Sequence, residues 1–160
     1  MNWETMILSS LHAIAAVIWV GGMFFAYRVL RPAAASLESR ERLILWEKVF
    51  RRFFGWVWFF IFVLVISGYW DWLTRLGPIE QAPLYLQLME WIGWVMVGLF
   101  TWLFFWPFAK FKIRMAQYEF AEAGHIMNTR MRPVIAINLM LGVIAVVIGA
   151  SGPFWPVIPF

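Results

Sequence analysis

The chain has 160 residues, of which 63% are hydrophobic, 20% aromatic and only 14% charged. A soluble domain of this size has too little interior for that much apolar surface, and a disordered chain would carry more charge and fewer aromatic residues. Cysteine is absent, which excludes disulfides, iron–sulfur clusters and cysteine-based zinc sites, and the net charge of +4 is better explained by orientation in a membrane than by nucleic acid binding.

Four apolar stretches are long enough to cross a bilayer as helices. They cover about residues 6–29, 53–73, 84–108 and 133–151. The sequence therefore predicts an all-α integral membrane four-helix bundle, formed by a single domain over residues 1–160. Its first partner is the lipid bilayer, and we expect no nucleic acid partner.

The connections between these spans differ in charge. Of the 13 Lys and Arg residues, seven lie within residues 28–52 and five within 109–132, whereas the connection between the second and third spans holds only Arg75. The positive-inside rule then places the two long loops, about 30–52 and 109–132, in the cytoplasm. Both termini are predicted on the outer, periplasmic side.

The first long loop is predicted to contain its own helix. Pro32 should end or kink the first helix. Residues 37–52 then form a short helix whose apolar residues Leu43, Leu45, Trp46 and Phe50 suggest a stripe that faces lipid at the membrane surface.

Strongly polar residues are costly inside a membrane and are therefore the first functional candidates. They are His12, Gln87, Glu90 and Asn138, with Tyr69 and Asp71 near a span end, and with Met89 as a soft ligand. From a rise of about 1.5 Å per residue, His12, Tyr69 and Glu90 lie roughly 9 Å to the outer side of the membrane midplane, and Gln87 and Met89 slightly further out. Asn138 is predicted to form a hydrogen bond between helices.

His12 is the sharpest of these features. Its helical face continues through small residues and Trp19, so that a neighbouring helix or a flat cofactor can approach closely. A neutral imidazole can bind copper or haem iron or relay protons, and imidazole with thioether suits both Cu(I) and haem. A histidine that only forms a hydrogen bond to another helix stays an alternative. The predicted cofactor-binding residues are His12, Trp19, Gln87 and Met89, and the predicted metal ligands are His12, Met89 and Glu90.

The residues around His12 also carry a family resemblance. The run Leu11-His12-Ala-Ile-Ala-Ala-Val-Ile-Trp-Val-Gly-Gly-Met-Phe-Phe-Ala-Tyr-Arg-Val-Leu-Arg-Pro32 resembles the first helix of the bacterial copper resistance D family. Three later blocks fit it: Arg52-Phe-Phe-Gly-Trp-Val-Trp, Ser67-Gly-Tyr-Trp and Arg132-Pro-Val-Ile-Ala-Ile-Asn-Leu-Met-Leu-Gly. The resemblance implies a multi-pass protein of the bacterial inner membrane that handles copper, in a family generally thought to move copper across that membrane.

The third span departs from this pattern. Relatives of the copper resistance D type tend to keep a His-x-Met pattern there, whereas this chain has Gln87 and Met89. The chain also has a more distant likeness to the membrane protoporphyrinogen oxidase, a four-helix haem b protein whose third helix carries a His and, two positions later, a Lys. Both groups are replaced here, so the departure counts more heavily against the oxidase than against the copper resistance D family.

Three functional hypotheses stay open. The leading one is metal handling, with copper or haem b bound in the outer half of the bundle. The second is a haem b oxidoreductase that passes electrons from a porphyrinogen or a quinol, which would make the protein an enzyme; no catalytic residue can be named. The third is a non-catalytic accessory subunit that packs against a larger membrane complex or against a second copy of itself.

Overall fold

The computed structural model describes residues 3–75 and 82–155. These residues form helices and short turns, and none of them is in a strand, so the prediction of an all-α chain is confirmed for the described part. The α-helices are α1 (Trp3–Phe24), α2 (Arg31–Ala33), α3 (Ser39–Arg75), α4 (Leu84–Leu103), α5 (Ala109–Ala116), α6 (Phe120–Ile126) and α7 (Arg132–Ser151). The π-helical segments are η1 (Phe25–Leu30), η4 (Phe104–Phe108) and η5 (Met127–Met131), and the 3-10 segments are η2 (Ala34–Ser36) and η6 (Gly152–Phe154).

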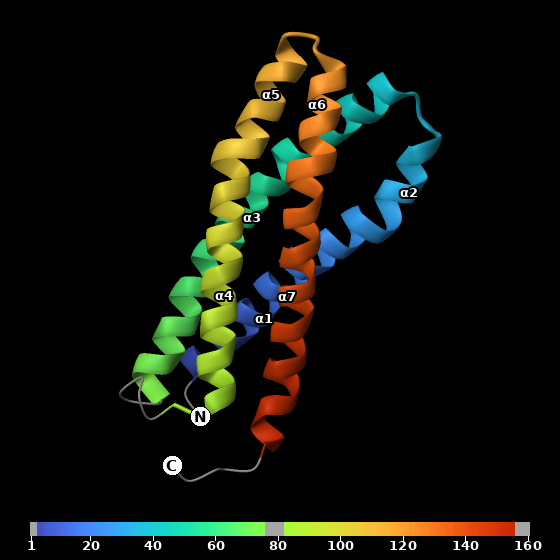
Figure 1. Ribbon diagram of the computed structural model, residues 1–160. Coiled ribbons are helices and arrows are strands. Elements are labelled where there is room, and N and C mark those ends of the chain that lie inside the picture. The colour runs from blue at the N-terminus through green and yellow to red at the C-terminus, as the bar shows by residue number, and fades with distance from the viewer. Residues whose placement is uncertain (1–2, 76–81, 156–160) are drawn as a thin grey trace.

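These segments join into four long helical rods, each apolar enough to cross a membrane (Figure 1). The four apolar stretches run over Met6–Ser36, Ser39–Trp70, Leu84–Ala116 and Phe120–Phe154. At about 1.5 Å per residue, stretches of 31 to 35 residues exceed the roughly 30 Å of hydrocarbon in a bilayer. Each rod therefore has the length to extend beyond the hydrocarbon region, into the segments predicted as loops.

Consecutive rods run in opposite directions (Figure 1). The start of α1, the end of α3, the start of α4 and the end of α7 lie at one end of the bundle, which we call the His12 end. The turns from η2 to α3 and from α5 to α6 lie at the other end. We call this the basic end, because it carries the Lys and Arg residues of 28–52 and 109–132.

The prediction of a lipid-facing surface helix over residues 37–52 is wrong. Helix α3 continues without a break from Ser39 to Arg75, and Leu43, Trp46 and Phe50 are buried within the protein. The reason is tertiary: α3 packs against α6, and Phe50 meets Phe108 edge to face at 6.3 Å between ring centroids. These side chains exclude lipid by packing on the third and fourth rods.

Each of the three described π-helical segments lies at a proline. Segment η1 ends just before Pro32, η4 contains Pro107, and η5 ends just before Pro133. A proline has no N–H and its ring collides with the carbonyl four residues earlier, and a wider turn relieves that collision without ending the helix. The first rod therefore continues past Pro32 to Ser36.

Packing is uneven along the bundle. Phe54 lies in an aromatic layer between α3 and α4, with ring centroids 4.9 Å from Phe108 and 5.4 Å from Phe100. Towards the His12 end, by contrast, none of the described side chains in residues 3–14, 84–95 or 143–151 is buried. The chain thus packs tightly in its basic half and leaves its His12 half more open to its surroundings.

Candidate functional site

His12 lies on α1 and is held by Ser67 of α3. The His12 Nδ1 and Ser67 Oγ atoms are 2.9 Å apart, and Ser67 Oγ is 2.6 Å from the carbonyl oxygen of Val63. A carbonyl oxygen only accepts, so the single hydroxyl hydrogen of Ser67 is donated to Val63. With that hydrogen directed at Val63, Ser67 Oγ can accept from a protonated Nδ1 of His12, and this contact orients the ring.

The imidazole can reach Ser67 because the next residue is a glycine. A Cβ atom at Gly68 would lie 3.3 Å from Cε1 and 3.7 Å from Nδ1 of His12. The ring therefore rests against the backbone of α3 at a position without a side chain. Ser67 is 2% exposed, so the hydrogen bond to His12 is shielded from competing groups.

A second polar group joins α3 to α4. The Tyr69 hydroxyl donates to Glu90 Oε1 at 2.6 Å and accepts from the Trp94 indole N–H at 3.1 Å. Tyr69 and Ser67 are two positions apart on α3, so their side chains leave the helix on nearly opposite sides. His12 and Glu90 therefore lie on different faces of α3, and none of the described contacts joins them.

Met89 and Gln87 are engaged elsewhere in this structure. Met89 lies over Gly149 of α7, where an added Cβ would be 3.2 Å from its sulfur. The Gln87 amide donates to the Ala82 carbonyl at 2.8 Å and so secures the start of α4. The candidates His12, Gln87, Met89 and Glu90 thus all lie towards the His12 end, but each of them contacts a different residue. The side chain of Asp71 lies outside the described residues.

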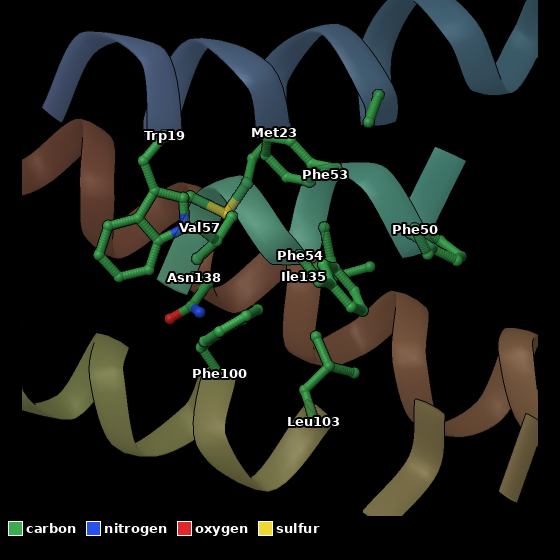
Figure 2. Close-up of a pocket in the computed structure, with 11 residues that line it drawn as sticks. Trp19, Met23, Phe50, Phe53, Phe54, Val57, Phe100, Leu103, Ile135 and Asn138 are labelled. Carbon is green, nitrogen blue, oxygen red and sulfur yellow. The ribbon is translucent and has the colours of Figure 1, made fainter. Parts of the chain in front are cut away.

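Trp19 lines a small central cavity rather than the surroundings of His12. Figure 2 shows Trp19 and Met23 entering it from α1, Phe100 from α4 and Asn138 from α7. The cavity offers about 10 Å³, which is at the lower limit for holding one water and far too small for a haem. Trp19 meets Phe100 edge to face at 6.3 Å, which is a packing contact.

Asn138 confirms the prediction of a hydrogen bond between helices. Its amide donates to the carbonyl of Met96 on α4 at 3.3 Å, while its Oδ1 atom is buried and finds no partner in the described structure. This bond ties α7 to α4 near the centre of the bundle.

The two histidines lie at opposite ends of the bundle, because His125 belongs to α6 at the basic end (Figure 1). One chain therefore has no second histidine to complete a bis-histidine haem site beside His12. Among the residues with described side chains, no group of three His, Asp or Glu could enclose a metal ion.

Sequence reasoning missed Ser67, Gly68 and Trp94 as parts of these groups. Ser67 and Gly68 belong to one of the blocks that carry the family resemblance, but nothing in that block shows a contact with the first span. The usable signal was a serine on a second span near the depth of His12, since a buried imidazole needs a hydrogen-bond partner.

Four long apolar helices and half-buried polar groups define a multi-pass α-helical membrane protein. A family model described as copper resistance protein D matches residues 47–151. This is more than half of the chain, which therefore belongs to the copper resistance protein D family. The match begins within α3, so that α1 and His12 precede it. No curated protein and no solved structure matches the chain.

Proposed function

We propose that this protein handles copper in the bacterial inner membrane and binds Cu(I), as cargo, in the His12 half of the bundle. Membership of the copper resistance protein D family supports the choice of copper as the metal. The main support for a site at this position is the partly buried His12 ring, which is oriented by the buried Ser67 on a neighbouring helix. Metal-binding histidines are commonly oriented by such a second hydrogen bond.

His12 is the proposed principal ligand and Met89 the proposed second ligand. Imidazole and thioether are donors that suit Cu(I), which accepts low coordination numbers. Met89 would have to turn from Gly149 towards α1, and its unbranched side chain has the rotatable bonds to do so. None of the described side chains of 84–95 is buried, so this half of α4 opposes such a rotation less than a packed core would. Glu90 and Gln87 would supply supporting polar groups.

The proposed orientation follows from the charges. With residues 30–52 and 109–132 in the cytoplasm and spans over about 6–29, 53–73, 84–108 and 133–151, the His12 end faces the periplasm. The site would then receive the ion from outside before its passage inward.

The test is a Cu(I) titration of detergent-purified protein against a competing chelator. His12→Ala should weaken binding by about a hundredfold and Met89→Leu by about tenfold, since even the loss of a residue that only orients a metal ligand costs ten- to a hundredfold. The controls are His125→Ala, which changes the other histidine, and Met140→Leu, an exposed methionine of α7. Both should bind as the unchanged protein does.

Two outcomes contradict the proposal. One is a protein that binds no Cu(I) above the level of detergent alone, and the other is a His12→Ala variant of unchanged affinity. An absorption spectrum of the same preparation distinguishes the haem hypothesis, because a Soret band lost in His12→Ala would assign His12 to haem.

A further inference from the structure

A second pocket opens at the basic end of the bundle, opposite the end that holds His12. It encloses about 570 Å³ and lies between the end of the first rod, the start of α3 and the α6–η5–α7 rod. This volume falls within the range of small-molecule sites, about 300–1,000 Å³.

The polar lining of this pocket is cationic. It consists of three arginines, one histidine and two neutral hydrogen-bonding side chains: Arg31, Ser39, Arg42, His125, Asn128 and Arg132. No Asp or Glu is among the described residues that line it. The arginines come from three places in the chain, since Arg31 opens α2, Arg42 lies at the start of α3 and Arg132 opens α7.

The three guanidinium groups have no anionic partner in the described structure. The charges of Arg31 and Arg42 both act on Arg132, which is partly buried. Arg31 lies 5.1 Å from the centre of the Tyr27 ring, and Arg42 donates to Ser39 Oγ at 3.3 Å, so their nearest contacts are neutral. No ion pair joins any of the three to a described carboxylate. Because like charges in a partly buried site repel strongly, an anion between them would be stabilising.

We propose that this pocket binds a phosphate group, carried either by the headgroup of an anionic phospholipid or by a free phosphate compound. The planar guanidinium fork pairs with phosphate oxygens, and Ser39 and Asn128 can donate further hydrogen bonds. Basic pockets between membrane helices on the cytoplasmic side are suited to anionic headgroups.

The rest of the lining fits a phosphate that carries a less polar part. Leu43, Phe120 and Met127 line the same pocket, so that its wall is both cationic and apolar. A ligand there would touch the first, second and fourth rods together. It would therefore stabilise the basic end, because a ligand that binds only the folded state raises stability. This inference is independent of copper binding.

The experiment follows thermal unfolding of the purified full chain in detergent. One arm adds phosphatidylglycerol in mixed micelles, with phosphatidylcholine as the neutral comparison. The other adds inorganic phosphate or pyrophosphate against chloride at constant ionic strength. We expect the unfolding temperature to rise with phosphatidylglycerol, with phosphate, or with both, and to stay constant with phosphatidylcholine and chloride.

Variants locate the effect. Arg42→Gln and Arg132→Gln should each raise the half-saturating concentration about tenfold, as expected for the loss of a charge-assisted hydrogen bond. Arg130→Gln is the matched control, because Arg130 is exposed, lies two residues from Arg132 and does not line the pocket. Ala121→Trp fills the pocket while it keeps every arginine, and so provides a second test if an arginine variant does not fold.

The outcomes separate the two sources. Stabilisation by phosphatidylglycerol alone assigns the site to a lipid headgroup, and stabilisation by phosphate assigns it to a free phosphate compound. The proposal is overturned if the unchanged protein responds to neither, or if Arg130→Gln weakens binding as much as Arg132→Gln does.

Discussion

At the scale of single residues, His12 is oriented by Ser67, a serine that donates its own hydroxyl hydrogen to the backbone. Ser67 donates to the Val63 carbonyl one turn earlier, as serines in membrane helices often do, and is left able only to accept. The sequence identifies His12 because an imidazole within an apolar span is conspicuous. It cannot identify Ser67, because the face that each helix presents to its neighbour depends on packing.

Ser67→Ala should therefore remove this hydrogen bond to the His12 ring without unfolding the chain. We expect about tenfold weaker Cu(I) binding, as is usual when a residue that orients a metal ligand is removed, and a change in the His12 tautomer. Nitrogen NMR of histidine-labelled protein measures the tautomer, and the chain has only 2 histidines to assign.

Ser10→Ala is the matched control for this variant. Ser10 lies on α1 two residues before His12 and donates to the carbonyl of Met6 at 2.8 Å, the same kind of bond that Ser67 forms with Val63. It should change neither the affinity nor the spectrum. A Ser67→Ala protein with an unchanged His12 ring signal would contradict the assigned hydrogen bond.

At the scale of whole elements, glycines set how closely the helices approach. A Cβ at Gly142 of α7 would lie 2.7 Å from Val20 of α1 and 3.2 Å from Met96 of α4. Gly22 of α1 similarly faces the Phe53 ring of α3. Small residues at such crossings are the usual means of close helix packing in membranes. The sequence shows how many glycines the helices contain, but only the structure shows which of these glycines lie where two helices cross.

Gly142→Ala should destabilise the bundle by about 1–3 kcal/mol, because the new methyl group overpacks a contact between three helices. Gly98→Ala is the control, since a Cβ at Gly98 of α4 meets nothing within 4 Å. That change should leave stability equal or slightly higher, because alanine favours the helix. Unfolding of both variants in mixed detergent and dodecyl sulfate micelles measures the difference, and equal stabilities would contradict the proposed crossing.

At the scale of the whole molecule, the two ends of the bundle differ in packing and charge. The basic half contains the aromatic layer around Phe54 and the cationic pocket, whereas the His12 half carries the neutral and acidic polar groups on loosely packed helices. This asymmetry matches the proposed orientation, with arginines towards the cytoplasm and His12 towards the periplasm.

The absence of cysteine makes this orientation directly testable. In spheroplasts, Glu4→Cys at the start of α1 should react with a membrane-impermeant maleimide. Glu122→Cys in α6 should react only after the membrane is permeabilised, because it lies at the basic end. Both residues are exposed, so burial does not explain a difference between them. The reverse labelling pattern would contradict the orientation, and the unchanged chain serves as the unlabelled control.

The sequence by itself determined the membrane class, the four apolar helices and the short set of polar candidates around His12. These properties depend on composition, on the length of apolar runs and on where charge falls along the chain, all of which are one-dimensional. Only the tertiary structure decided that Trp46 and Phe50 face protein rather than lipid, and that Ser67 holds His12 while Met89 lies against α7. It alone brought Arg31, Arg42 and Arg132 into one pocket. The rotation of each helix about its axis and its choice of neighbours follow from how side chains fit between helices, and the apolar pattern of a membrane span does not specify that fit.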